Sequence, residues 1–142
     1  MVIWNLKFMN KLLAIVADGY LPFLLLVTLG VGTLEIMRGY RSFWIKLFAS
    51  AMLLLAVTLL DLYVHFWAAL GLVYSIHTAI VLVLVVFIGA GLQSRIGWVF
   101  LLTSLLAYLE LLFYLGYRTW GDMALTLVVI GIGLGLIYRF LP

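Results

Sequence analysis

Long apolar stretches alternate with short polar turns along most of the chain. A bilayer hydrocarbon core about 30 Å thick needs about 20 residues of apolar helix to cross it. Apolar stretches of about this length cover residues 20–37, 43–66, 73–92, 98–116 and 123–138. The pattern predicts an all-α integral membrane protein with about five transmembrane helices in one bundle.

The first 17 residues show a different pattern. Lys7, Asn10 and Lys11 share one face of a helix, and apolar side chains occupy another. Such a pattern is typical of a short amphipathic helix lying in the membrane interface. We therefore expect residues 1–17 to form an interfacial helix and residues 18–142 to form a single transmembrane bundle. A frayed tail is the alternative for residues 1–17.

Composition excludes several classes of protein. Hydrophobic residues make up 68% of the 142 residues and charged residues only 9%, whereas a soluble domain carries about 25% charged residues. The chain has no cysteine, which excludes disulfides, thiolate metal sites and cysteine nucleophiles. The formal net charge of +3 is too small to indicate a nucleic-acid partner.

The distribution of charge predicts the orientation in the membrane. Five spans place the chain termini on opposite sides. The side that holds the C-terminus carries Arg38, Arg41, Lys46, Arg95 and Arg139 against Glu35, and the other side carries Lys7, Lys11 and Arg118 against Asp18 and Asp122. Lys and Arg collect on cytoplasmic loops. We expect a multi-pass protein of the bacterial cytoplasmic membrane with its C-terminus in the cytoplasm and its N-terminus outside.

Ionisable residues inside the predicted spans are the first candidates for a functional site, because burying a charge in lipid is costly. These residues are Asp61, His65, His77 and Glu110, with Arg118 and Asp122 just beyond a span. In the predicted topology all six lie toward the outer side. The alternative is that they are interfacial residues that reach for headgroups and water.

The spacing of these residues predicts which of them are neighbours, in two pairs. Asp61 and His65 are four residues apart and so share a helix face. Arg118 and Asp122 have the same spacing, which predicts an ion pair between them. We expect one cavity near the outer face, lined by Asp61, His65, His77, Arg118 and Asp122.

The last span contains a G-x-x-x-G pattern formed by Gly131 and Gly135. Small residues allow two helices in lipid to approach closely. The pattern predicts tight packing inside the bundle, and a dimer interface is the alternative.

Three segments of the chain are ADGY at residues 17–20, SIHTA at residues 75–79 and YLGYRTWGD at residues 114–122. Together they resemble motifs of a known family, the type-2 phosphatidate phosphatase superfamily of membrane lipid-phosphate phosphatases. The resemblance covers about residues 17–140. It implies that His77 would be the acid that protonates the leaving group and that Asp122 would orient the nucleophile.

The chain departs from this family at several positions. The nucleophilic histidine of the family falls on Arg118, and a Ser-Arg pair falls on Leu111 and Leu112. The first phosphate-binding motif falls on Asp61 through Ala69, without its cations. The resemblance therefore implies a protein that has lost the chemistry and kept the helical plan.

The sequence favours a catalytically inactive, lipid-phosphatase-like protein. It would act as an accessory subunit of a membrane complex, or as a lipid-binding scaffold with headgroup contacts from Arg118, His77, His65 and Asp61. We expect membrane lipids and other membrane protein subunits as partners, and no cofactor or metal.

Two alternatives remain open. One is an active phosphatase for lipid or isoprenoid (di)phosphates with an atypical site. The other is a haem-binding or proton-handling subunit, in which His65 and His77 would ligate haem b or a relay would pass through Asp61 and Glu110.

Overall fold

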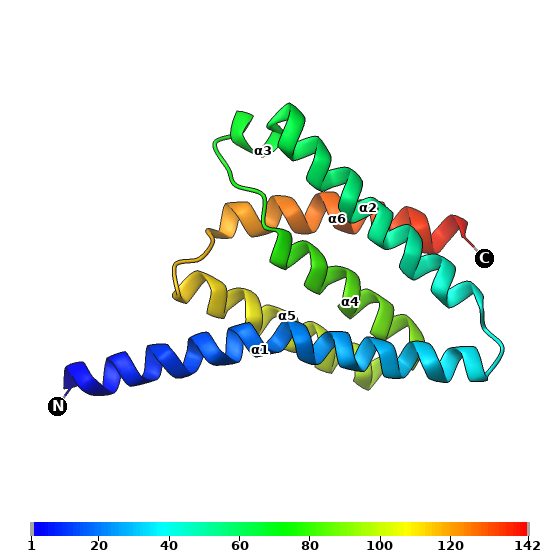
Figure 1. Cartoon of the computed structure of the whole chain (residues 1–142), viewed down its shortest axis with the longest axis horizontal. Coiled ribbons are helices and arrows are strands. Elements are labelled where there is room, and N and C mark those ends of the chain that lie inside the picture. Colours follow the sequence, from blue (N-terminus) through cyan, green and yellow to red (C-terminus); the bar gives the residue numbers. More distant parts are fainter. Residues whose placement is uncertain (1, 142) are drawn as a thin grey trace.

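A computed structural model describes residues 2–141 as an all-α bundle (Figure 1). The helices are α1 (Val2–Met37), α2 (Ser42–Val64), α3 (Phe66–Ala69), α4 (Ile76–Leu92), α5 (Arg95–Tyr114) and α6 (Trp120–Phe140). Four of them, α1, α2, α5 and α6, are long and apolar enough to cross a membrane. The prediction of an all-α integral membrane protein is confirmed.

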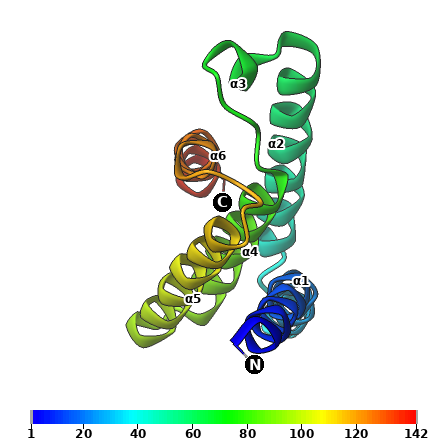
Figure 2. The ribbon, with the colours of Figure 1, turned by 90° about the vertical axis from the view of Figure 1, so that its left-hand side faces the viewer.

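The central helix of the bundle is α4, which is 17 residues long and apolar. It packs against α1, α2, α5 and α6, and Figure 2 shows it between α2 above and α1 with α5 below. Its side chains divide the core into two clusters. One, which includes Val81, Val85 and Leu109, joins α4 to α1 and α5. The other, which includes Val83 and Ile130, joins α4 to α2 and α6.

Helix α1 is a single continuous helix of 36 residues that contains Pro22. At 1.5 Å per residue it is about 54 Å long, well beyond the hydrocarbon thickness of about 30 Å. The two segments expected on either side of residue 17 are thus joined without a break. The interfacial position of residues 1–17 stays a prediction.

The first fully buried residue of α1 is Ala17, and Leu13 and Ala14 before it are partly buried. The buried residues of this helix are Ala17, Leu24, Thr28, Gly32 and Glu35, a spacing that places them on one helical face. Residues 2–12 are exposed throughout, and this part of the helix projects past the other helices (Figure 1). The bundle therefore contacts α1 from about Leu13 onward and leaves its first turns exposed.

Capping residues and turns fix the ends of the helices. The hydroxyls of Ser75 and Ser94 accept hydrogen bonds from the first turns of α4 and α5. Thr119 and Asp122 form a capping box at the start of α6, which satisfies two backbone N–H groups that would otherwise lack partners. The turn before α6 passes through Gly116 at φ 73°, a backbone conformation that glycine adopts without steric cost.

The two ends of the bundle differ in charge, as the sequence predicts. The α1–α2 connection, the α4–α5 connection and the C-terminus lie at one end (Figure 1). At this end the buried Glu35 pairs with Arg38 at 3.2 Å, and the ammonium of Lys46 lies 5.4 Å from the ring centre of Tyr138.

The glycine pattern in α6 packs differently from the prediction. A Cβ built on Gly133 would lie 2.5 Å from Cδ2 of Leu53 on α2, whereas one built on Gly131 or Gly135 would meet nothing within 4 Å. The prediction that Gly131 and Gly135 pack tightly inside the bundle is therefore wrong. Residue 133 lies on the opposite face of α6, and that face is the one turned toward α2. A dimer interface at Gly131 and Gly135 stays a prediction.

Candidate functional site

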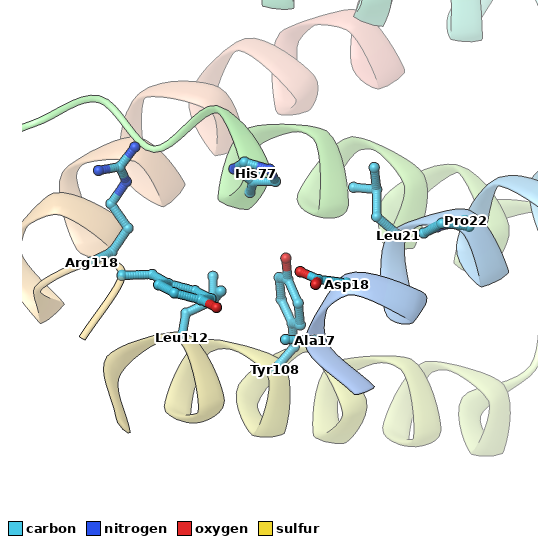
Figure 3. A pocket seen from close by; sticks show the side chains of 9 residues that line it. Ala17, Asp18, Leu21, Pro22, His77, Tyr108, Leu112 and Arg118 are labelled. Carbon is cyan, nitrogen blue, oxygen red and sulfur yellow. The ribbon is translucent and has the colours of Figure 1, made fainter. Parts of the chain in front are cut away.

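A pocket of about 480 Å³ lies between α1, the start of α4, the second half of α5 and the loop before α6 (Figure 3). Its lining residues are Ala17, Asp18, Leu21, Pro22, His77, Tyr108, Leu112, Tyr117 and Arg118. They come from segments as far apart in the sequence as residues 17 and 118. The pocket thus combines apolar walls with three side chains that can carry charge.

The charged side chains of the pocket come from three different elements. Asp18 lies on α1, His77 lies in the first turn of α4, and Arg118 lies in the loop between α5 and α6. Among residues 2–141 the one salt bridge is between Arg38 and Glu35, so Asp18 and Arg118 face the same pocket without pairing. An unpaired charge at the edge of a membrane bundle is costly unless water or a ligand contacts it.

An aromatic contact holds the wall of the pocket between α1 and α5. The rings of Tyr20 and Tyr108 stack with their centres 4.6 Å apart. The phenol of Tyr20 also makes a hydrogen bond of 2.8 Å with the hydroxyl of Ser104. These contacts join α1 to α5 two residues after Asp18.

Pro22 changes the backbone on the pocket side of α1. Proline has no N–H group and cannot donate the usual helical hydrogen bond to the carbonyl four residues earlier. That carbonyl belongs to Asp18, and both residues line the pocket. Asp18 therefore offers a carboxylate and a main-chain carbonyl without its normal helical donor.

The position of His77 depends on how the preceding loop is attached to α6. The backbone N–H of Val73 donates to Oδ1 of Asp122 at 2.9 Å, and the N–H of Ser75 donates to the hydroxyl of Thr126 at 3.3 Å. These two bonds fix the loop just before α4. The first turn of α4, which carries His77, follows directly from this anchored segment.

Asp122 does not form the predicted ion pair with Arg118. Its Oδ1 accepts from Val73, and its Oδ2 accepts from the N–H of Thr119 at 3.1 Å. Both carboxylate oxygens thus accept hydrogen bonds from backbone N–H groups. Arg118 lines the pocket instead (Figure 3). The predicted ion pair is wrong because capping the helix gives this buried carboxylate closer donors.

The expected cavity with five ionisable residues is also wrong, because only His77 and Arg118 of the five line the pocket. Asp61 and His65 lie at the end of α2, on the other side of α4 (Figure 2). There, Oδ1 of Asp61 accepts a hydrogen bond of 3.2 Å from the N–H of Trp67. Asp61 thus ties α2 to the short helix α3.

The two histidines do not share a site. His65 links α2 to α3 in the left-handed conformation, with φ 56°, and it is absent from the pocket that His77 lines. The described residues also contain no group of three or more His, Asp or Glu side chains that could hold a metal ion. This arrangement does not bring His65 and His77 together as a pair of haem ligands.

Glu110 belongs to a second, more open groove of about 450 Å³. Its other lining residues are Leu13, Ala107, Leu111, Phe113 and Tyr114. This groove lies between α5 and the projecting part of α1. Glu110 is thus separated from the charged residues of the first pocket.

Sequence reasoning missed Asp18, Tyr108 and Tyr117 as lining residues. Asp18 carried a usable signal, because an acidic residue four positions before a proline in an apolar helix has unusual hydrogen-bonding capacity. Nothing in the local sequence distinguishes Tyr108 or Tyr117 from the chain's other tyrosines. Only the packing of α5 against α1 and α4 directs them into the pocket.

Comparisons with known proteins give no relative for this chain. No protein-family model, no curated protein sequence and no solved structure matches it.

Proposed function

We propose that this protein is a non-catalytic membrane protein that binds the phosphate-bearing headgroup of a lipid in the pocket between α1, α4 and α5. The observation that carries the proposal is Arg118, a half-buried cation that lines this pocket without a carboxylate partner. A guanidinium matches the geometry of a phosphate and binds it through two parallel hydrogen bonds.

The apolar part of the pocket favours a lipid over a free anion. Leu21, Pro22 and Leu112 line it beside the charged residues, and these helices are long and apolar enough to lie in a membrane. A ligand with a phosphate joined to hydrocarbon would satisfy both kinds of wall. The basic connections lie at the other end of the bundle, and such connections collect on the cytoplasmic side. The pocket is therefore in the outer leaflet of a bacterial cytoplasmic membrane.

The three segments that resemble the lipid-phosphate phosphatases each contribute one Asp, His or Arg side chain to this pocket. Asp18 comes from the first segment, His77 from the second and Arg118 from the third. Their convergence supports a relationship in which the phosphate-binding plan persists without the reaction.

The side chains in the pocket do not supply a phosphatase mechanism. Arg118 stands where the family's nucleophile falls, and a guanidinium has no free lone pair with which to attack phosphorus. Asp122, which would orient a nucleophile, is bound to the N–H groups of Val73 and Thr119. His77 has no carboxylate partner within salt-bridge distance, so nothing polarises it as a base.

The experiment that tests lipid binding is native mass spectrometry of the purified protein after exchange into phospholipid nanodiscs. We expect retained phospholipid on the parent protein and about a tenfold or greater weakening in Arg118→Ala, the loss expected for a charged hydrogen bond. The matched control is Arg95→Ala, which removes an exposed arginine at the other end of the bundle. Equal lipid retention in the parent and both variants would overturn the proposal.

A second candidate function, as an accessory subunit, is favoured by the projecting first part of α1, residues 2–12. Residues 2–12 are all exposed and include the large apolar side chains of Trp4 and Phe8. Exposed apolar surface of this kind marks an interaction site for a membrane or another protein. Site-specific crosslinking from position 8 in intact membranes tests this function, because a protein partner gives a discrete heavier band and lipid alone gives none.

A further inference from the structure

The pocket presents two opposite charges to whatever occupies it. Asp18 lies on α1 and Arg118 in the loop before α6, and both line the pocket, at different parts of its wall (Figure 3). They do not neutralise each other, since the one salt bridge in the described part of the chain lies elsewhere. A purely anionic ligand would satisfy Arg118 and be repelled by Asp18.

The Asp18 side of the pocket is rich in hydrogen-bond acceptors. The two oxygens of the Asp18 carboxylate are acceptors when it is ionised. The phenol oxygen of Tyr108 lies beside this carboxylate (Figure 3). Several acceptors around one point suit a primary ammonium, which has three N–H donors and no acceptor.

The opposite side of the pocket is suited to an anion. Arg118 supplies its donors there, and His77 adds an imidazole N–H at the start of α4. The apolar side chain of Leu112 lies between the two charged sides (Figure 3). The pocket is therefore divided into an acceptor side and a donor side.

We infer that the ligand is a zwitterionic amine–phosphate headgroup, as in phosphatidylethanolamine, with its phosphate on Arg118 and its ammonium on Asp18. This inference rests on the proposed lipid-binding function and names the class of lipid. Each ligand charge then meets its opposite. An anionic lipid such as phosphatidate or phosphatidylglycerol leaves the Asp18 carboxylate without a cation, and a quaternary ammonium leaves its acceptors without N–H donors.

The test is competitive retention in nanodiscs that contain equal parts of phosphatidylethanolamine, phosphatidylcholine, phosphatidylglycerol and phosphatidate. We expect the parent protein to retain phosphatidylethanolamine about tenfold over each of the others, the ratio that one charged contact provides. Asp18→Asn should abolish this preference and leave overall phospholipid retention in place. Asp18→Glu, which keeps the charge, should preserve the preference and show that the effect is not a folding defect.

Glu110→Gln is the matched control, because Glu110 is a carboxylate near the same end of the bundle that lines the other groove. It should leave the preference unchanged. Equal retention of all four lipids by the parent, with weakening by Arg118→Ala, would overturn the zwitterion inference alone. No retained lipid and no effect of Arg118→Ala would overturn the proposed function as well.

Soluble headgroups distinguish a lipid from a free amine phosphate. Glycerophosphoethanolamine should displace bound phosphatidylethanolamine at high concentration, and glycerol phosphate should displace it much less. Equal displacement by both compounds would overturn the role given to Asp18. A lipid that binds more tightly than its own headgroup supports membrane phospholipid as the source of the ligand, whereas equal affinity would overturn the lipid assignment in favour of a soluble amine phosphate.

Discussion

The carboxylate of Asp122 accepts a hydrogen bond of 2.9 Å from the backbone N–H of Val73, which joins the first turn of α6 to the loop before α4. The same carboxylate caps α6 through Thr119. One side chain thus holds together the two segments that carry His77 and Arg118. Its role is structural, and it supports the pocket without entering it.

The substitution Asp122→Ala should destabilise the protein. It removes the hydrogen bonds that the buried Asp122 carboxylate accepts from the N–H groups of Val73 and Thr119, and a hydrogen bond to a charged group contributes about 1.5–3 kcal/mol. We expect a lower midpoint of thermal unfolding in detergent, with Asp122→Asn falling between the variant and the parent because an amide keeps one acceptor oxygen. An unchanged midpoint in Asp122→Ala would contradict the role given to these hydrogen bonds.

Arg118→Ala should have the opposite profile. Because Arg118 has no ion-pair partner, its removal should change the free energy of unfolding by less than about 0.5 kcal/mol. Lipid retention should fall as described above. The measurement is thermal unfolding in delipidated detergent solution, and a loss of stability comparable to that of Asp122→Ala would show that Arg118 makes a structural contact.

The two faces of α6 should respond differently to larger side chains. Gly133→Val should destabilise the bundle by about 1–3 kcal/mol, a typical cost of overpacking, because its Cβ would meet Leu53. Gly131→Val should leave the fold intact, since a Cβ there meets nothing within 4 Å. Size-exclusion chromatography with light scattering on Gly131→Val also tests the dimer interface, because that interface predicts a shift toward monomer.

The purified protein should not hydrolyse lipid phosphates. Loss of a single oxyanion-stabilising donor costs about 100- to 1,000-fold in rate, and this chain lacks the nucleophile as well as several cations. Phosphate release from phosphatidate, lysophosphatidate and an isoprenoid diphosphate should equal the background, measured beside an active phosphatase. Turnover that disappears in His77→Ala would instead establish an active enzyme with an atypical site.

Removal of residues 2–12 should leave the bundle as stable as the parent, because none of these residues is buried. The midpoint of thermal unfolding in detergent checks this. Any crosslinked protein partner should be lost in the shortened chain. A large fall in the midpoint would show that the first half of α1 contributes to the fold.

The sequence by itself determined the all-α membrane fold and the starts of three helices. Apolar stretches of about 20 residues have few alternatives to a membrane-spanning helix, because lipid leaves no other partner for the backbone. Ser75, Ser94 and the pair Thr119 and Asp122 then place the starts of three helices through local hydrogen bonds. These signals act over a few residues and can be read along the chain.

Only the tertiary structure decided which polar residues meet. Asp61 and His77 are equally plausible site residues in the sequence, yet His77 lies in the first turn of α4 and lines the pocket with α1 and α5. Asp61 lies at the end of α2 and accepts a hydrogen bond from the N–H of Trp67 instead. Asp18 reaches the pocket because α1 runs unbroken past residue 17 and is packed against the bundle there. The rotation of each helix about its axis depends on how its side chains fit its neighbours, and in a chain that is apolar on nearly every face, periodicity does not specify that rotation.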